Sequence, residues 1–266
     1  MESSTRKTGF VYDEIYLEHD TGHGHVERPD RLSFCLQALK QSGFWNQLHH
    51  IEATPATLDQ LCYVHKCDHI DRVKSHCQRE IPLDYDTPVS KQSFDIALLA
   101  AGGVLRAVDQ VIAGDVDNAF ALVRPPGHHA TPNRAMGFCL FNNIAIASRY
   151  LQSEHGLSKI AVVDWDVHHG NGTQDTFYAD PSVFFFSIHQ HPLYPGSGLA
   201  HETGLEKADG TTLNCPVPAH SDINDYIHVF KERLAPELIE FDPDFMLISS
   251  GFDAHQLDPL STINIT

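Results

Sequence analysis

Apolar and polar positions along the chain follow two different periods. Segments with apolar residues three or four positions apart predict helices, and short continuous apolar runs predict strands that are buried on both faces. We expect helices at about 29–41, in two short stretches that end near residue 78, and at 94–112, 138–153, 170–178 and 222–240. We expect strands at 8–12, 118–123, 160–164, 183–188 and 245–250.

From residue 118 onward, the expected strands and helices follow one another in turn. This order is typical of a parallel sheet that helices cover on both faces, and ligands bind such sheets beyond the carboxyl ends of the strands. Four of the strands are followed by unusual polar segments, which read RPPGHHA, DWDVHHGNG, HQHPLYPGSG and GFDAH. We therefore expect these four segments to meet at one edge of one sheet.

Length and composition favour a single globular domain over residues 1–266. Hydrophobic residues make up 42% and charged residues 20% of the chain, as in soluble globular domains. No apolar run approaches the ~18 residues that a membrane span needs, and the opening MESSTRKTGF lacks the apolar core of a secretory signal. The six cysteines form no Cys-x-x-Cys pair, so we expect reduced thiols in a cytoplasmic protein without membrane association.

The balance of charge narrows the choice of partners. A formal net charge of −17, from 35 acids and 18 bases, argues against direct binding of nucleic-acid phosphates. The same charge is compatible with cationic substrates. The 19 histidines gather in short clusters beside Gly and Asp, and these clusters direct attention to the polar segments.

Asp166 and His168 lie two positions apart, directly after the 160–164 strand. In extended backbone such side chains face the same way, so a carboxylate and an imidazole can reach one ion. Asp253 follows another strand and is the expected third ligand. Two carboxylates and one imidazole leave a position open for water, as in catalytic rather than structural zinc sites. Alternatively, Asp-x-His only caps a helix or forms a local hydrogen bond.

His128 and His129 follow a Pro-Pro-Gly turn and are the candidates for acid–base chemistry. A hydrolase needs a group that takes a proton from the attacking water, and imidazole suits this role because its ordinary pKa is close to neutrality. Asp164 and Asn171 lie beside the expected metal ligands and can orient such a histidine. The alternative is a pair of loop histidines in solvent.

Five ordered motifs together resemble the histone deacetylase and acetylpolyamine amidohydrolase family, in its class II-like branch. The motifs are RPPGHHA, GFCLFNN, DWDVHHGNGTQD, FFFSIHQHPLYPGSG and SSGFDAHQLDPL, and the resemblance runs from about residue 8 to 260. It implies a three-layer α/β/α fold of the arginase and deacetylase type, with a central, mostly parallel sheet of about eight strands. It also implies zinc-dependent hydrolysis of the amide of acetyl-lysine, in a histone or another protein, or of an acetylpolyamine.

The resemblance implies a role for each candidate residue. The catalytic histidines would be His128, facing Asp164, and His129, facing Asn171. We choose His129 as the base, although two interacting imidazoles titrate together and the sequence leaves that assignment open. The remaining roles fall in three groups: zinc ligands Asp166, His168 and Asp253; ligands of a structural potassium ion Asp164, Asp166, His168, Ser187 and Ile188; substrate contacts Gly137, Phe138, Tyr194 and Asp86.

The sequence departs from the family pattern at its end. Family members carry a catalytic Tyr in a Gly-rich loop beyond the last zinc ligand, whereas this sequence ends thirteen residues after Asp253. We expect a deacetylase domain that lacks this C-terminal segment, with turnover weakened by the loss of an oxyanion donor. Apolar surface left exposed would lower stability or form an interface in a homo-oligomer. The alternatives are a catalytically impaired acyl-lysine binder or scaffold and an arginase-like two-metal hydrolase.

Overall fold

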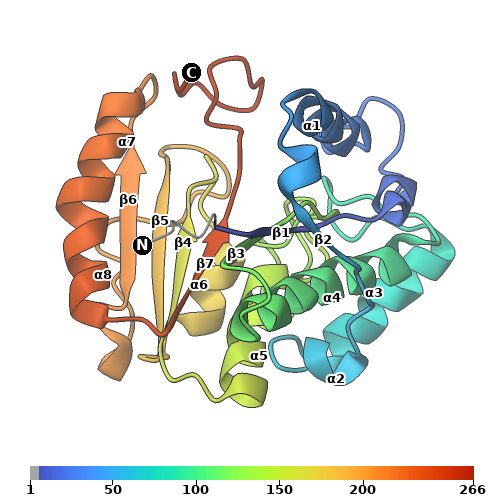
Figure 1. Cartoon of the computed structure of the whole chain (residues 1–266). Coiled ribbons are helices and arrows are strands. Elements are labelled where there is room, and N and C mark those ends of the chain that lie inside the picture. The colour runs from blue at the N-terminus through green and yellow to red at the C-terminus, as the bar shows by residue number, and fades with distance from the viewer. Residues whose placement is uncertain (1–5) are drawn as a thin grey trace. The chain divides into compact units, whose positions relative to one another are not determined.

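The computed structural model describes residues 6–266, which form two compact units that are described in turn. The first unit ends at Ala147 and the second begins at Ser148. Residues 1–5, the start of the segment in which we expect no secretory signal, lie outside the described residues. Both units combine parallel strands with helices (Figure 1). Within residues 6–266, no helix combines the length and the apolar character that crossing a bilayer requires.

The first unit is built on a three-stranded parallel sheet in the order β2-β1-β3. The central strand β1 carries Phe10 and Val11, which are buried in a cluster with Leu36 of the first helix and Ile96 of the longest helix. The strands of this unit are β1 (Thr8–Val11), β2 (His49–Ile51) and β3 (Asn118–Ala121). Its helices are α1 (Asp30–Gln41), α2 (Leu58–Leu61), α3 (Cys67–Arg79) and α4 (Ser93–Ile112), with 3-10 turns at Glu14–Glu18 and Trp45–Gln47.

A buried ion pair joins the N-terminal part of this unit to the segment that follows β3. Arg124 is fully buried, and its Nε donates to Glu27 Oε1 at 2.7 Å. The guanidinium also donates to the backbone oxygens of Tyr16 and His19 and to Thr21 Oγ1. A buried arginine keeps its charge, so these acceptors hold it and fix the chain before the Pro-Pro-Gly turn.

We expect Arg124→Met to lower the free energy of unfolding by about 3–5 kcal/mol, because it leaves the buried Glu27 carboxylate without its closest partner. Denaturant unfolding measures the change. The control is Arg28→Met, which removes a pair with Asp30 in which both side chains are more than half exposed. That control should cost at most about 1 kcal/mol. Equal losses in the two variants would show that the buried pair has no special part in stability.

The second unit is built on a four-stranded parallel sheet in the order β6-β5-β4-β7. On one face, Phe184 and Phe186 of β5 pack with Phe230 and Leu234 of the helical segment drawn in orange in Figure 1. The strands are β4 (Ile160–Asp164), β5 (Val183–Gln190), β6 (Thr212–Val217) and β7 (Phe245–Ser249). The helices are α6 (Asn171–Phe177), α7 (Ile223–Val229) and α8 (Ala235–Phe241), with a 3-10 turn at Glu206–Ala208; α5 (Asn143–His155) continues from the first unit.

The strands form two sheets, and this corrects one expectation. The RPPGHHA segment follows β3 of the three-stranded sheet, whereas the other three polar segments follow β4, β5 and β7 of the four-stranded sheet. The four segments therefore do not share the edge of one hydrogen-bonded sheet within residues 6–266. Each of them does begin at or just after the carboxyl end of a parallel strand, as the sequence predicts.

Two expected helices differ from those observed. The helix expected at 138–153 begins only at Asn143, because Gly137 and Phe138 adopt positive φ angles of 56° and 69° that interrupt any helix there. The helix expected at 222–240 changes to a π-helical turn at Phe230–Leu234 before α8. Pro236 in the first turn of α8 has no N–H to donate, which is a recognised cause of such interruptions.

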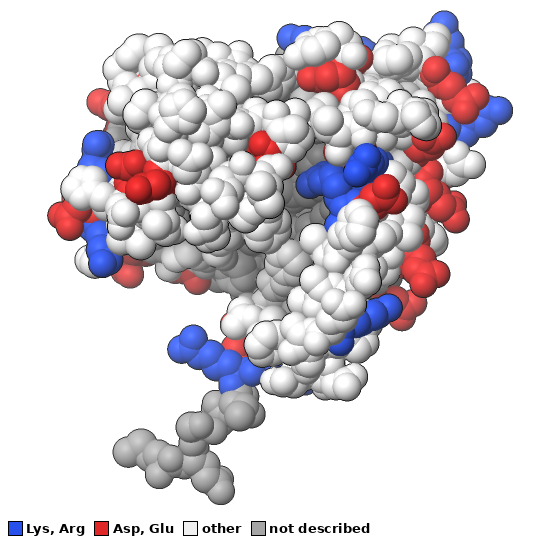
Figure 2. Space-filling view, turned by 90° about the horizontal axis from the view of Figure 1, so that it is seen from above, with Lys and Arg blue, Asp and Glu red and all other residues white. Residues whose placement is uncertain are grey.

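Charged side chains of both signs appear at several places on the face shown in Figure 2, and large areas of that face carry neither sign. Some surface charges of the protein are paired, and Arg134 Nη2 lies 2.6 Å from Asp84 Oδ2. The excess of acids is therefore not gathered into one patch on this face.

Candidate functional site

The strand β4 ends in a ladder of side chain to backbone hydrogen bonds. Asp164 Oδ1 accepts from the N–H of Asp166 at 3.0 Å, and Asp166 Oδ1 accepts from the N–H of His168 at 2.9 Å. Asp residues favour such bonds to the backbone two positions on. The intervening Val167 is buried, and its N–H donates to Asp253 Oδ1 at 2.9 Å. The ladder thus holds the alternate residues on one side of the chain and fastens Asp253 to the same turn.

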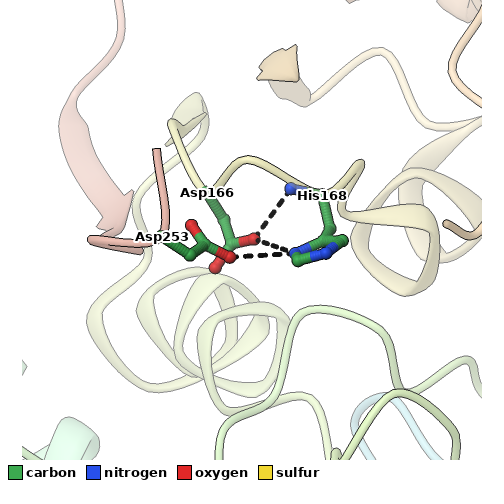
Figure 3. Close-up of side chains that lie close together, drawn as sticks. All are labelled: Asp166, His168 and Asp253. Carbon is green, nitrogen blue, oxygen red and sulfur yellow. Dashed lines mark hydrogen bonds and ion pairs between the residues drawn. The ribbon is translucent and has the colours of Figure 1, made fainter. Parts of the chain in front are cut away.

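Asp166, His168 and Asp253 converge in space (Figure 3). His168 Nδ1 lies 3.1 Å from Asp166 Oδ1 and 2.9 Å from Asp253 Oδ2. One donor atom from each residue lies within 4.8 Å of the other two, and among residues 6–266 this is the one group of acids, histidines and cysteines with such spacing. The sequence separation of Asp253 from the other two is bridged because β7 pairs with β4.

The negative charges of Asp166 and Asp253 raise the pKa of the groups beside them. Burial alone would lower the pKa of His168, but the hydrogen bonds and negative charges of Asp166 and Asp253 outweigh it and raise that pKa to about 10. Burial and the neighbouring charge of Asp166 raise the pKa of Asp253 to about 7. His168 and, in part, Asp253 therefore hold protons near neutral pH, and a divalent cation would take the place of these protons.

Gly251 makes room for the cluster. A Cβ atom at this position would lie 2.2 Å from Asp166 Oδ2 and 2.6 Å from its Cγ. Any larger residue would push the Asp166 carboxylate from its place, so the glycine allows the backbone after β7 to approach the ligand set. Nearby, Ser261 Oγ donates to the backbone oxygen of Asp253 at 2.8 Å and supports the same turn.

Three of the residues expected around a potassium ion lie close together in the second unit. Asp164 and Ser187 are register partners on β4 and β5, and both are fully buried. Ser187 Oγ lies 2.9 Å from His189 Nδ1. Ile188 follows on β5 and is likewise buried. The structure thus places these residues side by side, and the ion itself stays a prediction.

Tyr194, His169 and Asn171 also belong to the second unit. The ring of Tyr194 stands edge-on to the His168 ring, with 6.3 Å between the centroids. His169 instead directs its nitrogens to Ser197 Oγ and Gln174 Oε1, at 2.9 and 3.0 Å. Asn171 is buried at the first position of α6. Tyr194 therefore lies by the candidate ligand set, and its role as a wall residue stays a prediction. His169 is held by its hydrogen bonds to Ser197 and Gln174.

His128 and His129 are buried in the first unit rather than exposed in a loop. Their ring centroids lie 4.0 Å apart. Gly137 packs on the second ring, since a Cβ atom there would lie 2.4 Å from His129 Cδ2. The burial argues against the alternative of solvated loop histidines, because buried imidazoles are placed by their surroundings.

The substrate-contact candidates of the first unit lie together. Asp86 Oδ1 accepts from the N–H of Gly137 at 3.2 Å, and Thr87 Oγ1 accepts from the N–H of Phe138 at the same distance. These bonds hold the positive φ angle of Phe138, whose ring is half-buried. His25 meets that ring edge-on at 5.0 Å. Asp86 thus positions the loop that carries Phe138, and sequence reasoning had given His25 no such contact.

Sequence reasoning also missed His65, which holds the loop that follows His128 and His129. His65 is buried, and its Nε2 accepts from the N–H of Asn142 at 2.8 Å. Its Nδ1 donates to the backbone oxygen of Thr131 at 3.1 Å. Burial and the charge of His69 lower the pKa of His65 to about 3, which keeps the ring neutral and able to accept. The only signal in the sequence was a lone histidine between two cysteines.

Comparisons with known proteins show which proteins this chain is similar to. The model of the histone deacetylase domain family matches residues 25–266. A probable deacetylase of Archaeoglobus fulgidus is 40% identical over 261 residues, which cover 97% of this chain and 72% of that protein. A histone deacetylase-like amidohydrolase of Pseudomonas aeruginosa is 36% identical over an alignment 280 residues long. The alignment covers 98% of this chain and 74% of that protein.

A solved structure shows the same fold. The crystal structure of the HDA15 HD domain superposes with a TM-score of 0.94 at 39% sequence identity, over 98% of this chain and 76% of that chain. This confirms the α/β fold of the arginase and deacetylase type that the sequence predicts. The family match covers most of the chain, and the sequences of two relatives are more than a third identical to it. The chain belongs to the histone deacetylase family.

Proposed function

We propose that the protein is a zinc-dependent deacetylase, which hydrolyses the amide of acetyl-lysine or of an acetylpolyamine. One observation carries the proposal: the donor atoms of Asp166, His168 and Asp253 lie within 4.8 Å of one another. Family membership and the names of the relatives support the reaction type.

The donor set fits zinc. Imidazole nitrogen and carboxylate oxygen are both zinc ligands, and three protein ligands with an open position are typical of catalytic zinc. The raised pKa values of His168 and Asp253 indicate that positive charge stabilises the cluster. Gly251 leaves space for the carboxylate of Asp166. A two-metal hydrolase would need a second group of this kind, and the described part of the chain holds a single one.

The chain's own residues bind and orient the reactants. When bound, zinc supplies Lewis-acid polarisation of the acetyl carbonyl and of the attacking water. In the proposed reaction a ring nitrogen of His129 takes the proton of the attacking water and then passes it to the leaving amine. His128 supports the developing charge, and Phe138 with Tyr194 lines the path of the acyl chain. In this proposal Asp164 would orient the first histidine and Asn171 the second, as the resemblance to the family implies.

A second ion and a cationic substrate complete the proposed function. A structural potassium ion at Asp164, Asp166, His168, Ser187 and Ile188 would supply positive charge beside the buried Asp164 carboxylate. The substrate would be an acetylated lysine peptide or an acetylpolyamine, and the net charge of −17 suits a cationic one. We propose a cytoplasmic place of action.

The test is a turnover assay on an acetyl-lysine peptide and on an acetylpolyamine, run after metal removal and again after zinc is added. We expect cleavage only with zinc, and one zinc per chain by elemental analysis. Equal cleavage by the metal-free chain would exclude zinc dependence. Full zinc content without cleavage of either substrate would favour an acyl-lysine binder.

A further inference from the structure

Two exposed thiols lie next to each other in the first unit. Cys62 directly follows α2 and Cys67 is the first residue of α3, and their Sγ atoms are 3.8 Å apart. Both side chains are exposed, whereas Cys77, Cys139 and Cys215 are buried and Cys35 is partly buried. The pair is therefore open to reagents in solution and already close to bonding distance.

The turn between the two cysteines is hydrogen-bonded to residues 131–142 of the loop between β3 and α5. The same loop carries His128 and His129 further upstream. His65 holds the backbone of Thr131 and Asn142, as described above. The N–H of Lys66 donates to the backbone oxygen of Pro132 at 2.9 Å. Just after the second cysteine, His69 Nε2 lies 3.0 Å from the backbone oxygen of Leu140. The turn and the start of α3 thus hold both ends of the segment 131–142.

We propose that Cys62 and Cys67 are a reversible dithiol–disulfide site, and that its oxidation disturbs the His128–His129 loop and lowers turnover. The effect on turnover rests on the proposed deacetylase function, whereas disulfide formation and the change in the loop do not.

The oxidant is a low-molecular-weight disulfide such as glutathione disulfide. One cysteine thiolate attacks a sulfur of that disulfide and releases one glutathione thiolate. The second cysteine thiolate then attacks the protein sulfur of the mixed disulfide, forms the Cys62–Cys67 bond and releases the second glutathione. The two cysteine protons go to the two leaving thiolates, so one disulfide is reduced while another is formed. A thiol reductant reverses both steps.

Bond formation must bring the two sulfur atoms from 3.8 Å to about 2.05 Å. We expect the four residues between the cysteines to take up part of this movement. Because His65 is one of these residues, its hydrogen bonds to Thr131 and Asn142 should weaken. Partial burial and the hydrogen bond with Cys67 raise the pKa of Cys62, so oxidation should accelerate with rising pH as the thiolate increases.

The experiment treats the reduced full chain with glutathione disulfide and records three quantities. The intact mass should fall by two hydrogens, and peptide mapping should assign the bond to Cys62 and Cys67. The amide of Asn142, which donates to His65, should exchange its hydrogen faster. Turnover on an acetyl-lysine peptide should fall at least about tenfold, since a displacement of ~1 Å at a catalytic group can cost about 10²-fold. Dithiothreitol should restore all three.

Matched variants separate this pair from the other thiols. The double variant Cys62→Ser/Cys67→Ser should keep its turnover and its Asn142 exchange under oxidation, and Cys35→Ser should respond like the unaltered chain. A stable glutathione adduct, no reaction, or a bond to another cysteine would overturn the site. A Cys62–Cys67 bond with unchanged exchange at Asn142 would overturn the link to the loop. If the reduced chain does not cleave the peptide, the proposed function fails, while mass and exchange still decide this inference.

Discussion

Asp166→Ala should lose its zinc and its turnover together. The carboxylate is one of three donors that lie within 4.8 Å, so its removal leaves too few protein ligands for a catalytic zinc. Loss of Lewis-acid stabilisation worth several kcal/mol corresponds to a fall in turnover of at least about 10²–10³-fold. Elemental analysis and the acetyl-lysine assay, run on the same sample, measure the two losses.

Asp166→Asn refines this test, because the amide can still accept the N–H of His168 and keep the ladder after β4. We expect this variant to stay folded and to bind zinc far more weakly, since a neutral amide is a poor zinc ligand. The control is Asp175→Asn on α6, which neutralises an exposed acid in the same unit. A full equivalent of zinc in the Asp166 variants would show that the ligands are assigned wrongly.

His129→Ala should lower turnover by at least about 10²-fold while zinc stays bound, which is the size expected of acid–base catalysis. His129 is buried against Gly137 and belongs to the first unit, so its loss leaves the donors of the second unit in place. The assay and the zinc content, measured together, distinguish a lost proton carrier from a lost metal.

His129→Gln fills more of the space left by the ring and separates loss of the base from loss of packing against Gly137. A parallel His128→Ala variant compares the two imidazoles, and His23→Ala removes an exposed histidine from the same unit as a control. Near-normal turnover in both His129 variants, with a large loss in His128→Ala, would transfer the role of base to His128.

Much of the fold could be predicted because buried parallel strands have a plain pattern. The strand expected at 160–164 has the same bounds as β4, and the helix expected at 94–112 differs from α4 by one residue. Two strands, β2 and β6, were not predicted. The three residues of β2 are too few to show a periodic pattern of apolar positions. β6 lies at an edge of its sheet and contains Pro216, a residue that argues against a strand wherever the sheet edge is unknown.

Part of the candidate site could also be predicted from the sequence, and part of it could not. The structure brings Asp166, His168 and Asp253 together, as the spacing and the strand ends indicated, and their role as zinc ligands stays a prediction. The loop of Phe138 could not be predicted, because its positive φ depends on bonds to Asp86 and Thr87, some fifty residues away in sequence. Local patterns carry no information on contacts of this kind.

The central position of β1 has a practical consequence for anyone who wishes to trim this protein. The family match begins at residue 25, but β1 (Thr8–Val11) lies before that point and pairs with both β2 and β3. A chain that started at residue 25 would lose the one strand that joins the other two, and its two remaining strands would present unpaired backbone on their inner edges. It would also lose Tyr16, His19 and Thr21, which accept from the buried Arg124 guanidinium. The smallest useful expression boundary therefore lies upstream of β1, and the first residue of the family match is a poor guide to where the folded domain begins.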